Sequence, residues 1–219
     1  MKKPGVVILK SPIAFFLAIA WLALLASCRT APESADAVSS ASPAGRDMPA
    51  VAGDIAPVED GMRVLVVYFS QGSATKRVAV DLAFFLGADT ERIIELKKRT
   101  GLFGFLSAGA DSSMGKATPI ETPARDPALY DRVVVCTPVW AWHLAPPVRT
   151  WLFKMRGRLP DCVYVVVSAD TAPEKIVPMM EEASGKAPIA YAGFVGKDFI
   201  PKNRATYVRK LGVLAGKLH

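Results

Sequence analysis

Only three cysteines and two histidines occur among the 219 residues, and their spacing matches no zinc site. No run of lysine and arginine is interleaved with aromatic residues, which argues against a nucleic-acid partner. No nucleophile–base pair and no paired carboxylates form a pattern typical of hydrolytic catalysis. What remains is a chain with 51 % hydrophobic and 21 % charged residues, enough to build the core of one ordinary domain. We therefore expect no metal and no nucleic acid among its ligands.

Residues 1–27 have the organisation of an export signal. Three lysines precede an uncharged apolar run over residues 13–25, and two small residues then precede Cys28. The run Leu25-Ala26-Ser27-Cys28 resembles a bacterial lipobox, which implies that Cys28 is lipidated and becomes the mature N-terminus. Two acyl chains give durable anchoring because each buried methylene contributes about 0.8 kcal/mol. The alternative is an uncleaved transmembrane helix over residues 6–26, and either structure tethers the remainder to a membrane.

Residues 28–61 differ abruptly in composition. Ala, Pro, Ser, Asp and Val dominate, and there is no apolar periodicity, so this stretch is predicted to be a flexible tether. Loss of the three signal lysines lowers the formal charge from +7 to +4. This mildly basic balance would suit a phosphorylated ligand or an anionic membrane surface, although an ordinary solvated surface explains it as well.

From residue 62 to residue 219, short apolar runs alternate with helical patterns. Strands are predicted at 62–69, 91–96, 132–137, 163–167 and 189–194. Helices are predicted at 74–86, at about 147–155, at 174–183 with Pro178 as a kink or the true start, and at about 207–218. Cys136 and Cys162 fall in or beside apolar strands, near opposite ends of expected neighbours, so we predict buried thiols without a disulfide.

Strands without polar alternation are buried on both faces, as in a parallel sheet between two helical layers. We therefore predict an α/β domain with three layers and a doubly wound, five-stranded parallel sheet of order 2-1-3-4-5. With that order the chain reverses direction between strands 1 and 3, and a ligand crevice opens at their carboxyl ends. The loops at 70–75 and 138–142 should line it.

The first loop opens a helix, where backbone N–H groups and the positive end of the helix dipole favour a phosphate. Its candidate ligand-binding residues are Ser70, Gln71, Gly72, Ser73, Ala74 and Thr75. The run from Tyr68 to Lys76 resembles the phosphate loop of flavodoxins, usually Ser/Thr-x-Thr-Gly-x-Thr. Gly72 and Ser73 depart from that pattern. A positive φ at Ser73 would cost about 1–2 kcal/mol, unless the glycine has moved one place. A plain strand-to-helix turn is the alternative.

The second loop contains Pro138, Val139, Trp140, Ala141 and Trp142, and it resembles the segment after strand 3 of flavodoxin-family oxidoreductases. In that family this segment flanks the flavin ring. The resemblance implies that Trp140 or Trp142 stacks on an isoalloxazine, which would exclude water and tune its potential. Alternatively, both indoles pack on neighbouring loops. His143 beside them is either a proton donor to a quinone or flavin, or a surface residue.

The third loop, 168–173, lacks the glycines whose amides contact the flavin's pyrimidine edge in relatives. Ser168 and Asp170 are its candidate contacts, and a carboxylate at Asp170 would disfavour an anionic reduced flavin. Alternatively, Asp170 or Thr171 caps the next helix. The long connection 97–130 carries an apolar, glycine-containing stretch at 101–106, expected as a short covering helix or as a lid.

The resemblance to flavodoxins implies FMN as the cofactor and a membrane-tethered oxidoreductase or electron-transfer function. A quinone or a membrane redox partner would then suit a protein held by lipid at Cys28 in the bacterial envelope, facing outside the cytoplasm. The alternative is a flavodoxin-like domain that has lost its flavin and serves as a binding or scaffold lipoprotein.

Overall fold

The computed structural model describes residues 61–99 and 101–218. The predicted signal peptide, Cys28 and the tether lie outside these residues. The described strands are β1 (Val64–Tyr68), β2 (Asp89–Arg92), β3 (Arg132–Trp140), β4 (His143–Leu144), β5 (Asp161–Ser168) and β6 (Ala190–Val195). Five of them form a parallel sheet in the order β2-β1-β3-β5-β6, and the short β4 pairs antiparallel with β3. The predicted five-stranded, doubly wound parallel sheet is therefore confirmed, with β4 as an addition.

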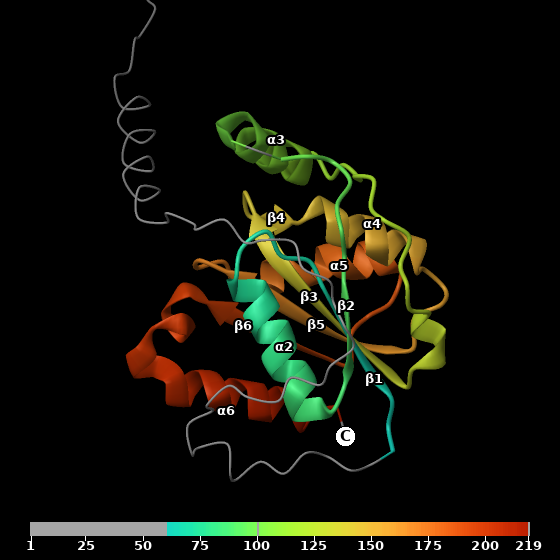
Figure 1. Cartoon of the computed structure of the whole chain (residues 1–219), viewed down its shortest axis with the longest axis vertical. Coiled ribbons are helices and arrows are strands. Elements are labelled where there is room, and N and C mark those ends of the chain that lie inside the picture. The colour runs from blue at the N-terminus through green and yellow to red at the C-terminus, as the bar shows by residue number, and fades with distance from the viewer. Residues whose placement is uncertain (1–60, 100, 219) are drawn as a thin grey trace, which may run out of the picture. The chain divides into compact units, whose positions relative to one another are not determined.

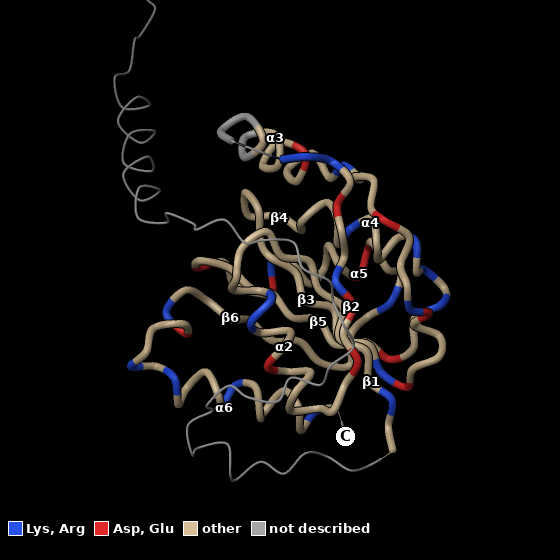
Figure 2. Tube along the Cα trace, in the orientation of Figure 1, with Lys and Arg blue, Asp and Glu red and all other residues tan. Residues whose placement is uncertain are grey.

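Helices cover both faces of the sheet (Figure 1). They are α2 (Ala74–Leu86), α3 (Gly101–Ser113), α4 (Pro146–Lys154), α5 (Val177–Ser184) and α6 (Arg204–Ala215). Helices α2 and α6 pack on one face, and α4 and α5 pack on the other. The central strands carry charge only at the first residues of β3 and β5, Arg132 and Asp161 (Figure 2). Such strands can be buried on both sides, and burial of their valines stabilises the fold at roughly 25 cal/mol per Å².

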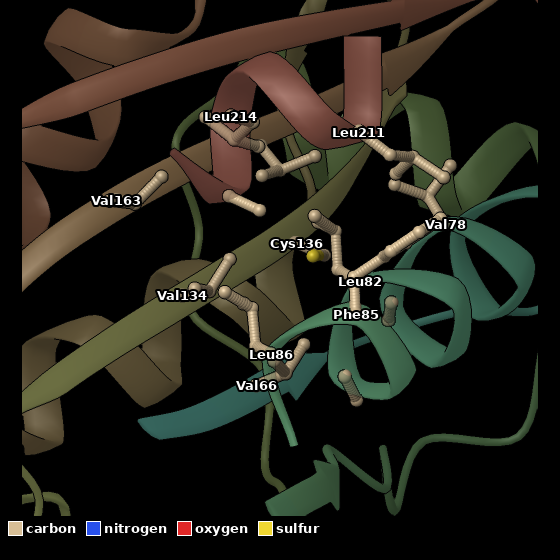
Figure 3. Close-up of a cluster of buried hydrophobic side chains, with 14 of the residues drawn as sticks. Val66, Val78, Leu82, Phe85, Leu86, Val134, Cys136, Val163, Leu211 and Leu214 are labelled. Atoms are coloured by element: carbon tan, nitrogen blue, oxygen red, sulfur yellow. The ribbon is translucent and has the colours of Figure 1, made fainter. Parts of the chain in front are cut away.

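The core consists of two clusters, one on each side of the sheet. The first joins Val66 and Val134 of the sheet to Leu82 of α2 and Leu211 of α6 (Figure 3). The second includes the fully buried Trp151 of α4. Residues between Met62 and Leu218 thus form a hydrophobic core on each face of the sheet.

Two strand boundaries differ from the predictions. The second strand begins at Asp89, and it pairs with β1 over Asp89–Arg92. Its predicted continuation pairs elsewhere, because Glu121 N donates to Ile94 O and Leu96 N donates to Pro119 O. The third strand does not end at Thr137 but runs on to Trp140, so that Pro138 is a strand residue. Phe69 N donates to Cys136 O, so the carbonyl of Cys136 points toward β1. The backbone nitrogen of Pro138 points to the same side, but β1 has already ended at Tyr68.

Helix α5 begins at Val177, after a 3-10 turn at 173–175, so Pro178 marks the true start of the helix rather than a kink. Cys136 and Cys162 are buried, free, and three positions apart in register, on opposite faces of the sheet. Burial raises the pKa of Cys162 to about 12 and raises the pKa of Cys136 further.

Over the described ranges, no helix is long and apolar enough to cross a bilayer, and no cluster of three or more His, Cys, Asp or Glu side chains could hold a metal.

Candidate functional site

The three predicted loops meet at the carboxyl edge of the sheet. Tyr68, the last residue of β1, is in register with Cys136 of β3, and Pro138 is in register with Val167 of β5. The first two loops also touch, because the rings of Phe69 and Trp140 lie edge to face, 5.4 Å apart. Residues about seventy positions apart in sequence therefore line one edge, as the strand order requires.

The loop from Ser70 to Thr75 presents backbone donors. Ser73 precedes α2 with φ −95° and makes no side-chain cap, and the first turn of the helix contains no acidic residue. The amides of residues 71–76 make no hydrogen bond to another described residue. Since the first amides of a helix have no intrahelical acceptor, they can all point to a ligand. Neither Gly72 nor Ser73 has a positive φ, so the altered glycine position carries no backbone strain.

Side chains complete the electrostatics of this loop. Thr75 is 3 % exposed and its hydroxyl makes no hydrogen bond to another described residue, whereas the buried Ser70 hydroxyl donates to Gly72 O over 2.5 Å. Arg92, the last residue of β2, donates from Nη2 to Ser70 O over 3.4 Å. Backbone amides, the N-terminus of α2 and a guanidinium meet here, and the first turn of the helix has no acidic residue, which is the donor set of an anion site.

The second loop is a hairpin rather than an irregular loop. Trp140 of β3 pairs with His143 of β4 across the two-residue turn Ala141–Trp142. Both turn residues have positive φ, 46° and 62°, the backbone of a type I′ turn that glycine and asparagine usually occupy. Because αL backbone costs non-glycine residues about 1–2 kcal/mol, the surrounding structure must hold this turn in place.

The two tryptophans have different environments. Trp140 packs on Phe69, and the guanidinium of Arg99 lies over its ring with 5.5 Å to the centroid. Trp142 is 65 % exposed at the tip of the hairpin. The indole of Trp142 is therefore available to a ligand, while that of Trp140 is largely engaged with neighbouring segments. His143 is half-buried, with Nδ1 2.7 Å from Ala141 O, so it braces the turn.

The third loop also offers free amides. The Ser168 hydroxyl donates to Thr171 O over 2.9 Å, and Gly196 N donates to Ala169 O. The N–H groups of residues 169–171 make no hydrogen bond to another described residue. The absence of glycine therefore does not prevent this loop from donating to a ligand. The predicted helix cap is wrong, because Ala172 occupies the N-cap position and Asp170 is exposed.

Helix α3 is fixed beside the hairpin by a buried ionic cluster, defined here as Glu95, Arg99 and Asp111. Arg99 Nε lies 2.9 Å from both carboxylate oxygens of Glu95, and Nη1 lies 3.1 Å from Asp111 Oδ2. The hydroxyl of Ser112 donates to Leu144 O of β4 over 3.0 Å. The predicted helix at 101–106 is thus part of a longer one that packs on β3, β4 and α4.

Sequence reasoning missed Phe69, Arg92 and Arg99. The signal for Arg92 was its place at the end of the strand beside the first loop, which a correct register for β2 would have revealed. Arg99 gave no comparable signal, because its partners are brought together by tertiary packing.

A cavity of about 230 Å³ lies beside β2, and Arg92, which also donates to the first loop, is among its lining residues. It is bounded by β2, by residues 120–125 and by Trp151. Glu91 borders it and accepts from the amides of Ala124 and Arg125, while burial raises the pKa of the Glu91 carboxyl. None of the predicted site residues lines this cavity.

The order of the sheet and the meeting of the three loops define a doubly wound α/β domain with a ligand crevice at its carboxyl edge. No protein-family model matches the chain, and no curated protein matches its sequence significantly. The structure is similar to that of a flavoprotein in complex with FMN from Lactobacillus acidophilus NCFM, at 20 % identity and a TM-score of 0.54, over 60 % of this chain and 93 % of that one.

Two Bacteroides proteins classed as flavoproteins are also similar. That from Bacteroides eggerthii DSM 20697 has 18 % identity, a TM-score of 0.52 and coverage of 68 % of this chain and 96 % of its own. That from Bacteroides uniformis ATCC 8492 has 17 % identity, a TM-score of 0.51 and coverage of 68 % and 99 %. At such identities the likeness establishes the fold, which is flavodoxin-like.

Proposed function

We propose that this domain binds FMN at the carboxyl edge of its sheet and acts as an oxidoreductase or electron-transfer protein. The observation that carries the proposal is the uncapped first turn of α2, whose free amides stand beside the Thr75 hydroxyl and Arg92. A dianionic phosphate monoester fits such a donor set. The likeness to a Lactobacillus flavoprotein whose structure contains FMN supports the same ligand here.

Each loop then has a separate role. The amides of residues 71–76 hold the phosphate, and Trp142 covers the ring and excludes water from it. The amides of residues 169–171 donate to the pyrimidine edge, with Asp170 close enough in the loop to disfavour negative charge on the ring. When bound, FMN supplies hydride or single-electron transfer, and the protein positions it and sets its potential.

The lipobox resemblance extends the proposal to location. We propose that lipid on Cys28 holds the domain on a membrane of the bacterial envelope, outside the cytoplasm, where a quinone or a membrane redox partner is at hand. Labelled fatty acid should be incorporated by the full chain and not by Cys28→Ala. Equal labelling of both chains would refute the anchor and leave the flavin proposal untouched.

Flavin binding is tested with the polypeptide of residues 61–219, incubated with FMN and freed of excess. We expect a flavin absorption spectrum and quenched flavin fluorescence. Thr75→Val should weaken binding about 10- to 100-fold, since a hydrogen bond to a charged group contributes about 1.5–3 kcal/mol. Trp142→Ala should change the spectrum, whereas Phe153→Ala, an exposed aromatic on α4, should not.

A colourless protein that binds no FMN would reject the proposal. That result would favour the other candidate, a binding or scaffold lipoprotein of the envelope. Binding that survives both Thr75→Val and Trp142→Ala unchanged would place the flavin elsewhere than in this crevice.

A further inference from the structure

The outer surface of helices α2 and α6 is far more basic than the rest of the domain. Helix α2 and residues 196–218 together contain eight Lys and Arg and two Asp, a net charge of +6. The described residues as a whole contain 22 Lys and Arg and 14 Asp and Glu, a net charge of +8. Three quarters of the net charge therefore belongs to one helical layer, and Figure 2 shows Lys and Arg along α6 and the turns before it.

The two carboxylates in this layer are neutralised within it. Asp198 is 3 % exposed and accepts from Lys210 Nζ over 2.7 Å. Asp81 accepts from the Tyr207 hydroxyl over 2.7 Å and lies 3.8 Å from Arg77 Nε. Neither compensates the outward-facing cations.

Three of the remaining cations are exposed on α6 or beside its ends. These are Lys202 in the turn before α6, Arg209 on the helix and Lys217 after its end, and none of the three forms an ion pair with another described residue. Lys76 in the first turn of α2 and Lys197 in the 3-10 turn 196–199 are also exposed and form no ion pair with another described residue. We call this set of five residues the basic face.

Apolar side chains are interspersed with these cations. Val213 of α6 is 58 % exposed, Phe84 of α2 is 57 % exposed, and Ile200 before α6 is 43 % exposed. None of the exposed residues between 196 and 218 is Asn, Gln, Ser or Thr, the side chains that read bases alongside arginine. Cations mixed with exposed aliphatic and aromatic groups match a bilayer surface, where the charges meet headgroups and the apolar groups enter the acyl boundary.

We infer that the basic face of α2 and α6 docks on a bilayer that contains anionic phospholipid. Helices α2 and α6 lie side by side on one face of the sheet, so their outer sides form one continuous surface (Figure 1). Docking there needs neither FMN nor lipid on Cys28. The lipid proposed on Cys28 would hold the face near the membrane and strengthen the contact.

Sedimentation with vesicles tests this surface in the polypeptide of residues 61–219, which contains both core clusters. Vesicles of phosphatidylcholine with phosphatidylglycerol should bind the protein, vesicles of phosphatidylcholine alone should not, and added salt should release it. Each Lys or Arg near an anionic bilayer contributes about fivefold to partitioning. The triple variant Lys202→Gln/Arg209→Gln/Lys217→Gln should therefore bind on the order of 100-fold more weakly.

A matched control removes the same charge elsewhere. Lys98, Lys154 and Lys175 are exposed and form no ion pair with another described residue, and their change to Gln should alter partitioning less than about threefold, because only general attraction is lost. Val213→Ser should weaken vesicle binding severalfold without changing its salt dependence, since it removes apolar contact alone.

Three results would overturn the inference. Equal losses in the two triple variants would mean that net charge, not this face, drives binding. Binding to duplex DNA as tight as to the vesicles, and insensitive to Val213→Ser, would make the face a general polyanion site. Residues 29–60 contain two Arg and six acidic residues, a net charge of −4. If vesicle binding disappears when these residues are present, the partner of the basic face is that segment and not the bilayer.

Discussion

Replacing Arg99 by methionine should destabilise the domain strongly, because it leaves a buried carboxylate without its cation. The side chain of Arg99 is 1 % exposed and that of Glu95 is 5 % exposed. Without Arg99, Glu95 would keep only the hydroxyl of Thr118, which donates to it over 2.7 Å. Breaking a buried ion pair by removing one partner costs about 3–5 kcal/mol. Such a loss is a large part of the roughly 5–15 kcal/mol that holds a domain together.

Urea unfolding of residues 61–219, followed by tryptophan fluorescence and by circular dichroism, gives this free energy. The neighbouring exposed Lys98→Met serves as the control and should stay within about 0.5 kcal/mol of the parent. Arg99→Met/Glu95→Met should recover part of the loss, since two apolar side chains replace a charged pair. A loss below about 1 kcal/mol for Arg99→Met, or a double variant no more stable than the single one, would refute the buried cluster.

Two further predictions concern the same region. The hydrogen bond from Lys97, assisted by Arg99, lowers the pKa of Asp111, so the contribution of this carboxyl is present above its unfolded pKa and is lost as pH falls through its folded pKa. Asp111→Asn should therefore be less stable at neutral pH and lose less stability on acidification, and an unchanged pH slope in urea titrations would contradict this. Ala141→Gly should raise the free energy of unfolding by about 0.5 kcal/mol, since relief of the αL cost exceeds the added chain entropy; a destabilised variant would mean that the turn is unstrained.

The fold was predictable because its signals are local and repeated. Valine-rich runs such as the one around Val134 predict strands buried on both faces, and α2 has the bounds, 74–86, that its apolar pattern predicted. The strand order then placed the loops at 70–75 and 138–142 on one edge. The packing of Phe69 on Trp140 confirms this adjacency.

The details of the crevice were not predictable from patterns, because they depend on where a neighbouring strand ends. Pro138 reads as a strand breaker, yet β1 has already ended beside it, so no hydrogen bond is lost. A hairpin whose turn is Ala141–Trp142 contradicts the usual preference for glycine or asparagine, and only tertiary contacts can impose it. The ionic cluster around Arg99 joins residues of two segments whose proximity no sequence spacing reveals.

The two proposed surfaces of this domain share helix α2, which fixes their relative orientation. The helix begins at the crevice with Ala74 and runs along the face of the sheet, so its first turn faces the phosphate site and its outer side belongs to the basic face. With that face on a bilayer, the crevice would open along the membrane surface rather than away from it. A partner dissolved at the interface, such as a quinone headgroup, could then approach Trp142 without leaving the membrane. Neutralising Lys202, Arg209 and Lys217 should therefore slow reaction with a membrane-dissolved quinone far more than with a water-soluble one, and equal slowing of both would dissociate the two surfaces.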